Sequence, residues 1–304
     1  MSSLKDFCKN NSIKLELGKD LTNYSTLKLK AVGDLLTLKS IEEVQKTVIF
    51  LKSKSTDYQV LGWGANTLLK ETSESIYLQL AFPFEKNYLS EVRDEYELPA
   101  SIGLNRLTAH AIKFGLRGWE VFTGVPASLG GAVFMNAGTK LGEIGDIVKR
   151  VLIVTNYGKL REVVVNNESF SYRQNNFLKE DEIIVGLILG HMGIDKEVSI
   201  EIKNYIDLRN KTQPLTKRTC GCVFKNKALD KNGKLIPGCL AGQTIDKIGL
   251  KGFRYKNLQI SPVHANFIEN LGESTYTDFL EFVEIIKKKI LDEAGMDFEL
   301  EVRL

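Results

Sequence analysis

The segment "GVPASLGGAVFMNAG", residues 124–138, consists mainly of small residues. A close-packed glycine crossing would explain some of them. So many small residues in one short run favour another interpretation, because a backbone that packs along a large flat cofactor needs this composition. The segment therefore predicts a cofactor-binding fold.

A second glycine-containing loop, "LGWGANTLL", lies at residues 61–69. Its glycines allow the close approach of a ligand, and its backbone NH groups can bind a diphosphate. The pattern is neither a P-loop nor the dinucleotide-binding GxGxxG motif. On its own, the loop also fits a plain junction between a strand and a turn.

Helices and strands are expected in an irregular order. Helical patterns cover residues 40–52, 104–115, 198–213 and a stretch that begins near Thr275. Strand patterns cover residues 57–66, 75–82, 148–165, 181–192 and 297–304, and the first of these ends in the glycine loop. Ser40 with Glu43 predicts a capping box at the start of the first helix. Because strand, helix and strand do not alternate strictly, the chain is expected to be α+β rather than a doubly wound sheet.

Bulk composition excludes several classes of protein. The net charge is +3, with basic and acidic residues interleaved, so nucleic-acid binding is not expected. No apolar run approaches the roughly 20 residues of a membrane-spanning helix, and no signal peptide is expected at the start. Four cysteines without an export signal indicate free thiols in a reducing cytoplasm.

The segment "TCGCVFKN", residues 219–226, places Cys220 and Cys222 one residue apart. They could be half of a metal site, half of a disulfide, two unrelated side chains, or include a working thiol. A zinc site needs about four Cys or His ligands at workable spacing, and this chain does not offer them, so no metal is expected. A flavin attached covalently to histidine stays open, although neither glycine-rich segment contains a histidine. Taken alone, Arg173 is best read as a solvated arginine and His264 as a hydrogen-bonded structural group.

Taken in order, the motifs of this chain resemble those of one family, the UDP-N-acetylenolpyruvoylglucosamine reductases (MurB). The family's segments are G-G-G-S-N-L-L, G-I-P-G-S-V-G-G-A-V-x-M-N-A-G, Y-R-x-S-x-F, G-S-x-F-K-N-P, A-G-x-L-I-E-x-x-G-L-K-G, A-Q-V-S-x-x-H-A-x-F-I-x-N and L-E-x-E-V-R. Their counterparts here are "GWGANTLL", "GVPASLGGAVFMNAG", "YRQNNF", "GCVFKN", "AGQTIDKIGLKG", "LQISPVHANFIEN" and "FELEVRL". The resemblance runs from about residue 22 to the C-terminus, and "RNKTQPL" is similar to a segment of the shorter subtype.

The resemblance implies an α+β fold with a two-part FAD-binding region of the vanillyl-alcohol-oxidase type, at residues 1–82 and 83–195. A C-terminal α+β domain, residues 196–304, would bind substrate. It also implies a cytoplasmic monomer with noncovalent FAD that uses NADPH to reduce a UDP-sugar. The reaction would be that of a UDP-N-acetylmuramate dehydrogenase in peptidoglycan synthesis, with no nucleic-acid or membrane partner.

The resemblance also implies roles for individual residues. Arg173 would bind the substrate carboxylate, Glu301 would help to orient it, and Cys222 would protonate the reduced sugar in place of the family's serine. Residues expected to contact FAD are Gly62, Trp63, Gly64, Ala65, Asn66, Thr67, Gly124, Val125, Pro126, Ser128, Gly131, Ala132, Asn136 and Gly138. Residues expected to contact the sugar substrate are Arg173, Arg209, Lys225, Asn226 and Gln259.

This chain departs from the family pattern at several positions. Cys222 replaces a serine, Ala65 replaces another serine, and Lys227 replaces a proline. Lys30 with Ala31 stands where the family has a double glycine, and the 227–239 loop is longer than usual. Glu299 is the alternative to Glu301 as the active-site carboxylate. Alternative functions are an FAD-linked oxidase on the same cofactor fold and a non-catalytic flavin- or nucleotide-sugar-binding protein.

Overall fold

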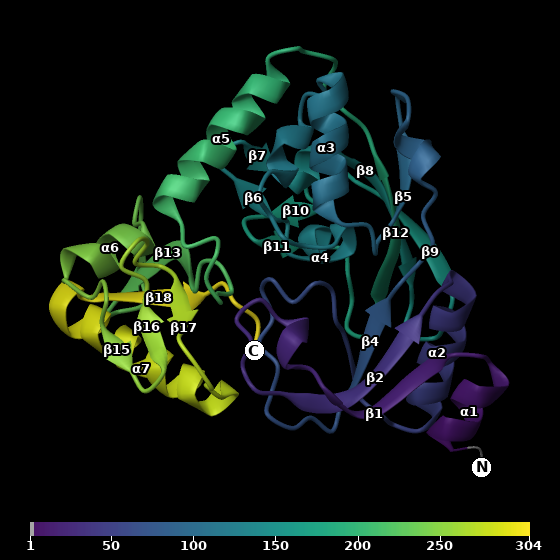
Figure 1. Cartoon of the computed structure of the whole chain (residues 1–304), viewed down its shortest axis with the longest axis horizontal. Coiled ribbons are helices and arrows are strands. Elements are labelled where there is room, and N and C mark those ends of the chain that lie inside the picture. Colours follow the sequence, from purple (N-terminus) through teal and green to yellow (C-terminus); the bar gives the residue numbers. More distant parts are fainter. Residues whose placement is uncertain (1–2) are drawn as a thin grey trace. The chain divides into compact units, whose positions relative to one another are not determined.

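The computed structural model describes residues 3–304, which divide into two compact units. The first unit comprises the residues up to Lys19, Gly33–Trp63 and Glu74–Asp207. The second unit comprises Asp20–Val32, Gly64–Ser73 and Leu208–Leu304. Both units mix helices with largely antiparallel sheets, so the predicted α+β class is confirmed (Figure 1). The domain boundaries predicted at residues 82 and 195 stay a prediction.

The first sheet of the first unit has the strand order β1-β2-β4-β3. Its strands are β1 (Lys14–Asp20), β2 (Val32–Leu38), β4 (Ile76–Leu80) and β3 (Tyr58–Val60), and β4 runs parallel to both β2 and β3. Two helices accompany this sheet, α1 (Leu4–Asn10) and α2 (Ile41–Ser53). In α2, Val44, Val48 and Leu51 are buried in one cluster with strand residues. Each such side chain stabilises the fold by about 1.5–3 kcal/mol when it is buried completely.

The second sheet of the first unit has the order β5-β12-β8-β9, and its paired strands are antiparallel. The strands are β5 (Tyr96–Pro99), β12 (Ile183–Leu189), β8 (Val148–Val154) and β9 (Leu160–Val164). Its helices are α3 (Leu104–Phe114), α4 (Leu129–Phe134) and the part of α5 (Val198–Thr212) up to Asp207, where the second unit resumes. Short 3-10 turns lie at Lys86–Leu89, Trp119–Phe122 and Ile144–Ile147. Two small hairpins complete it, β6 (Gly138–Thr139) with β7 (Gly142–Glu143), and β10 (Phe170–Ser171) with β11 (Gln174–Asn175).

The second unit contains two three-stranded sheets, β14-β13-β18 and β15-β16-β17. The strands are β13 (Phe224–Asp230), β14 (Leu235–Ile236), β15 (Arg254–Tyr255), β16 (Leu258–Ile260), β17 (Ile268–Asn270) and β18 (Met296–Leu300). The helices are α6 (Ala241–Lys247) and α7 (Tyr276–Ala294), with a 3-10 turn at Thr22–Tyr24. The buried face of α7 lies in one core with Leu27, Leu29 and Leu68, which come from distant parts of the sequence.

The ends of α2 and α3 follow the sequence predictions except that only half of the predicted capping box of α2 forms. Ser40 caps α2 by accepting a hydrogen bond from the Glu43 NH at 3.1 Å. The Glu43 carboxylate accepts from the Lys39 NH, one residue before the expected partner. The helix α3 ends at Gly115, whose φ of 70° is the left-handed conformation expected there.

The sequence did not predict the course of the long 227–239 segment. In the structure this segment forms most of the β13–β14 hairpin.

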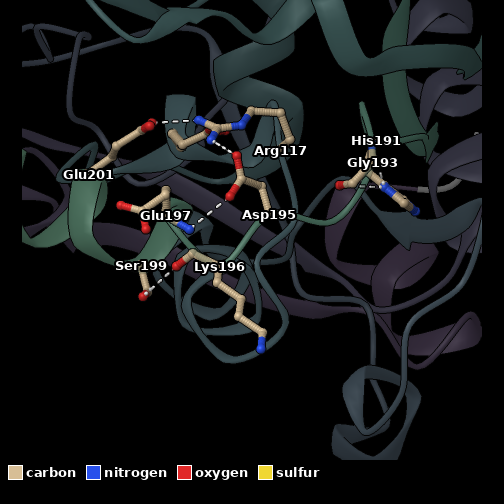
Figure 2. A network of polar contacts seen from close by, with 9 residues as sticks. Arg117, His191, Gly193, Asp195, Lys196, Glu197, Ser199 and Glu201 are labelled. Carbon is tan, nitrogen blue, oxygen red and sulfur yellow. Dashed lines mark hydrogen bonds and ion pairs between the residues drawn. The ribbon is translucent and has the colours of Figure 1, made fainter.

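A charged network attaches the start of α5 to the rest of the first unit (Figure 2). The Arg117 guanidinium donates to the carboxylates of Glu120, Asp195 and Glu201. A backbone hydrogen bond from Glu197 and the Arg117 side chain lower the pKa of Asp195. Among residues 3–304, no helix is both long and apolar enough to cross a membrane.

Candidate active site

The two glycine-rich segments meet inside the first unit. A Cβ atom added at Gly62 would lie 2.9 Å from Ser128 Oγ, and one added at Gly131 would lie 3.2 Å from the same atom. Gly62 and Gly131 therefore leave little room for a side chain, while Gly124 and Gly131 are exposed. Accessible backbone with so few side chains fits a flat cofactor that packs closely against the chain.

Some small residues in these segments are explained by packing within the protein. A Cβ atom at Gly130 would lie 2.7 Å from the Ala100 Cβ, and Gly103 lies beneath the Trp63 ring. The backbone bonds Leu129 NH to Ile102 O and Gly130 NH to Ala100 O join the 100–104 and 127–130 segments. Close packing within the protein thus explains Gly130. It does not explain the exposed Gly124 and Gly131, to which the predicted cofactor contact still applies.

Asn136 has a structural task in the second segment. Its side chain is buried; Nδ2 donates to Glu143 Oε2 at 2.7 Å and to the Ser171 carbonyl at 3.0 Å, and Oδ1 accepts from the Gly145 NH at 3.0 Å. These bonds fix the β6–β7 hairpin against β10. The predicted contact between Asn136 and a cofactor stays a prediction.

Arg173 lies at the tip of the β10–β11 hairpin with a φ of 58°. Its Nη2 donates to the Gly138 carbonyl at 3.0 Å. A Cβ atom at Gly138 would lie 2.8 Å from Arg173 Nη1, so glycine leaves room for the guanidinium there. The structure therefore joins the predicted substrate arginine to the end of the predicted cofactor segment, within the first unit.

The first glycine-rich loop is divided between the units after Trp63. Gly64 has a φ of 63°, and a Cβ atom there would lie 2.0 Å from the Tyr24 carbonyl, so glycine is required. Asn66 donates through Nδ2 to the Glu301 carbonyl at 2.9 Å, and its own carbonyl accepts from the Arg303 NH at 3.0 Å. The loop therefore supports the end of the chain that carries the predicted catalytic glutamate.

Five further residues of the two segments are predicted to contact the cofactor, and these contacts stay a prediction. They are Ala65, Thr67, Val125, Pro126 and Ala132.

Cys222 lies just before β13 and Glu301 just after β18, and these two strands of the second unit are paired. The Glu301 NH donates to the Val223 carbonyl at 2.8 Å, and Cys222 forms an isolated antiparallel bridge with Phe267. The Cys222 residue is half-buried. Cys220 is fully buried, and this burial raises its pKa to about 12, with smaller contributions from Cys222 and Glu301. A group at Cys222 can therefore meet a ligand, whereas Cys220 stays a protonated core thiol.

Glu299, the alternative carboxylate, has other partners. Its two oxygens pair with Lys225 Nζ and Lys227 Nζ, each at 3.2 Å. These ion pairs lower the pKa of Glu299, with Lys225 as the largest cause. Of the two glutamates, Glu301 is the one whose backbone NH donates to the Val223 carbonyl, next to Cys222. The structure also gives Lys227, which replaces the family's proline, a place in this ion pair.

The remaining predicted substrate residues all lie in the second unit. Arg209 is in the last turn of α5. Asn226 accepts a hydrogen bond from the Ala241 NH at 3.0 Å, at the start of α6. Gln259 lies on β16 and donates to the Gly252 carbonyl at 3.4 Å. Lys225 contacts Glu299, so the side chains of Lys225, Asn226 and Gln259 take part in protein contacts that the sequence did not indicate.

Two families match successive parts of the chain. Residues 35–163 match the FAD binding domain family, and residues 213–304 match the C-terminal domain of UDP-N-acetylenolpyruvoylglucosamine reductase. The chain is 31% identical to the UDP-N-acetylenolpyruvoylglucosamine reductase of Chlamydia pneumoniae over 93% of this chain and 90% of that protein. It is 29% identical to the reductase of Syntrophomonas wolfei over 100% and 98% of the two chains.

Among solved structures, the chain is similar to the UDP-N-acetylenolpyruvylglucosamine reductase (MurB) of Thermus caldophilus. The TM-score is 0.76 at 30% sequence identity, and the match covers 96% of this chain and 98% of the other. This likeness extends over both units. The prediction of a FAD-binding region followed by a separate C-terminal domain is therefore confirmed.

Proposed function

This chain belongs to the UDP-N-acetylenolpyruvoylglucosamine reductase family, and from this premise we propose that Arg173, Cys222 and Glu301 carry out its chemistry. It is a flavin oxidoreductase, a UDP-N-acetylmuramate dehydrogenase of peptidoglycan synthesis. FAD is its cofactor and NADPH is its hydride donor. We further infer that FAD is bound noncovalently and that the enzyme is a cytoplasmic monomer.

The exposed glycine backbone supports a cofactor site in the first unit. Gly62 and Gly131 border the Ser128 hydroxyl without side chains of their own, and Gly124 is exposed. These residues would hold the cofactor through backbone contacts. When bound, FAD supplies the hydride that it has received from NADPH.

The residues of the chain must then manage the charge and the proton. Hydride addition at C3 of the enolpyruvyl group leaves an electron pair at C2 that is shared with the substrate carboxylate. Arg173 stabilises this negative charge through its guanidinium, which suits a carboxylate geometrically. Cys222 transfers its Sγ proton to C2, which completes the saturated product and leaves a thiolate that takes a proton from water.

The observation that carries the assignment of Cys222 is its place in the second unit. It is half-buried, and the backbone of the neighbouring Val223 is hydrogen-bonded to that of Glu301. Cys220, by contrast, is fully buried. A thiol with an ordinary pKa of about 8.5 is a stronger acid than the serine hydroxyl of the family, so the replacement preserves the chemistry.

Turnover with NADPH and UDP-N-acetylenolpyruvoylglucosamine tests the proposal. The purified protein is expected to be yellow, and stopped-flow absorbance should show flavin reduction by NADPH followed by reoxidation by the sugar. Acid precipitation should release the flavin to the supernatant. Flavin that stays in the pellet would contradict noncovalent binding. Reduced flavin that reacts with oxygen but not with the sugar would favour the oxidase alternative.

A further inference from the structure

A buried asparagine lies beside the segment that carries Cys222. Asn266 is only 3% exposed, although its side chain is polar. A buried amide must find hydrogen-bond partners, because an unsatisfied polar group inside a protein is destabilising. The partners of Asn266 therefore indicate what the residue does.

The Asn266 side chain acts as a second strand partner for Phe224, which also pairs with Leu300 of β18. The Phe224 NH donates to Asn266 Oδ1 at 3.0 Å, and Asn266 Nδ2 donates to the Phe224 carbonyl at 2.8 Å. One amide side chain thus forms both bonds that a residue of a neighbouring strand would form with Phe224. Shorter polar side chains cannot supply a donor and an acceptor in this geometry.

The Asn266 backbone binds Val223, the residue before Phe224. The Val223 NH donates to the Asn266 carbonyl at 2.9 Å, and the Val223 carbonyl accepts from the Glu301 NH at 2.8 Å. The following residue of the loop, Phe267, forms the antiparallel bridge with Cys222. Residues 222–224 are therefore fixed between the 266–267 segment on one side and the end of β18 on the other.

The segment around Asn266 is itself held in place. Its NH donates to His264 Nδ1 at 3.2 Å, and the Phe267 NH donates to the His264 carbonyl at 3.0 Å. The Ser261 NH donates to the Phe267 carbonyl at 2.8 Å, which closes this turn. A rigid support of this kind is what an accurately placed reactive group requires.

We propose that Asn266 is a positioning residue that sets the location of the Cys222 thiol through its paired bonds to Phe224. The proposal rests on the proposed function in one respect, since it takes Cys222 as the proton donor. Asn266 does not touch the substrate in this role. Its loss therefore affects the step that needs the thiol and leaves the reaction of NADPH with the flavin unchanged.

Stopped-flow kinetics of the Asn266→Ala variant tests this directly. Reoxidation of the flavin by the sugar should slow by about a hundredfold, the loss typical of a misplacement of about 1 Å. Flavin reduction by NADPH should keep its wild-type rate, and kcat should fall while KM for the sugar stays near its wild-type value. Equal slowing of both half-reactions would overturn the proposal, because it would indicate a general structural defect.

Alkylation of Cys222 by iodoacetamide gives a second readout that does not depend on turnover. Mass spectrometry that resolves each cysteine should show Cys222 of Asn266→Ala reacting about tenfold faster, because its strand opens more often without the paired bonds. An unchanged rate would overturn the placement of Cys222 by Asn266. Suppose that Cys222→Ala retained full activity, while Cys222 of Asn266→Ala was still alkylated faster than in the wild type. The assignment of Cys222 as proton donor would then fail, and the positioning of Cys222 by Asn266 would stand.

Asn270 provides a matched control. It is also buried, at 4% exposure, and its Nδ2 donates to the Leu27 and Lys28 carbonyls at 3.0 and 2.9 Å. Asn270→Ala should lower stability in a similar way but leave Cys222 alkylation at the wild-type rate. If Asn266→Ala does not fold, Asn266→Asp serves in its place, since it keeps the acceptor for the Phe224 NH and puts a carboxylate oxygen where the donor to the Phe224 carbonyl was. Wild-type alkylation and sugar kinetics in Asn266→Asp would overturn the proposal.

Discussion

Arg173 and Cys222 are held by their backbones in contrasting ways. Arg173 lies at the tip of a hairpin whose strands have two residues each, with a positive φ and a hydrogen bond to the Gly138 carbonyl. Cys222 lies in an extended segment that is bonded on both sides, to residues 266–267 and to residues 301–302. The difference fits their proposed tasks. A guanidinium acts through charge over several ångströms, whereas a proton donor acts only at hydrogen-bond distance.

The largest expected effect is that of removing the thiol. Cys222→Ala should slow flavin reoxidation by the sugar by about a hundred- to ten-thousand-fold, the usual contribution of positioned proton transfer. Cys222→Ser should keep appreciable activity, because a hydroxyl restores the group of the family. Stopped-flow measurement of both half-reactions is the check. If the alanine variant reduces the sugar like the wild type, another group or water is the donor.

The effect of removing the Arg173 guanidinium should be smaller. Arg173→Ala loses a charged hydrogen bond of about 1.5–3 kcal/mol, which corresponds to roughly ten- to a hundredfold in the sugar half-reaction. Arg173→Lys should recover part of this rate, because it keeps the charge but not the planar fork. Rates of flavin reduction by NADPH serve as the control. An equal loss there would point to a role in flavin binding instead.

Glu301 and Glu299 should differ although only one residue separates them. Glu301→Gln should slow the sugar half-reaction by about tenfold, as expected for the loss of one charged hydrogen bond. Glu299→Gln breaks only the partly exposed ion pairs with Lys225 and Lys227, and such pairs contribute about 0–1 kcal/mol. Kinetics of the sugar half-reaction, measured for both variants side by side, decide which of the two glutamates is the catalytic carboxylate. The reverse order of effects would make Glu299 the catalytic carboxylate.

The smallest effect is expected at Cys220. Burial raises its pKa from 9.0 to about 12, so the folded protein holds this proton more tightly than the unfolded chain does. Its contribution to stability is complete below pH 9 and is lost as the pH rises toward 12. Above pH 9, the free energy of unfolding measured with urea should therefore fall less steeply in Cys220→Ala than in the wild type. Activity and alkylation at Cys222 should stay as in the wild type. If the free energy of unfolding fell equally steeply with pH in Cys220→Ala and in the wild type, the Cys220 thiol would not be shielded from water.

The long helices could be predicted from the sequence because their signals are local. Apolar residues at helical spacing, a capping serine at Ser40 and a terminal glycine at Gly115 correspond to α2 and α3. The hairpins β6–β7 and β10–β11 were missed, since strands of two residues show no periodicity. The association of residues 20–32 and 64–73 with the C-terminal unit was also missed, because it depends on contacts across the fold rather than on local pattern.

The site was predictable to the extent that reactive groups lie in recognisable segments. Cys222 and Glu301 could be selected from motifs, and the structure shows that Glu301 is hydrogen-bonded through its backbone to Val223, the residue next to Cys222. The role of Asn266 could not be read in the same way. A polar residue among apolar ones indicates a buried hydrogen bond, but the partner, Phe224, lies far away in the sequence.

The link between the first glycine-rich loop and the C-terminus has a consequence for biosynthesis. The Arg303 NH bonds to the Asn66 carbonyl, and the Leu68 NH bonds to the Arg303 carbonyl. A nascent chain that has reached residue 207 already contains every segment of the first unit. The second unit must wait for its last strand, so residues 20–32 and 64–73 emerge from the ribosome long before their C-terminal partners exist. A chain whose synthesis stops a few codons early therefore contains every segment of the first unit, but it leaves the Asn66 carbonyl and the Leu68 NH without their partners at Arg303.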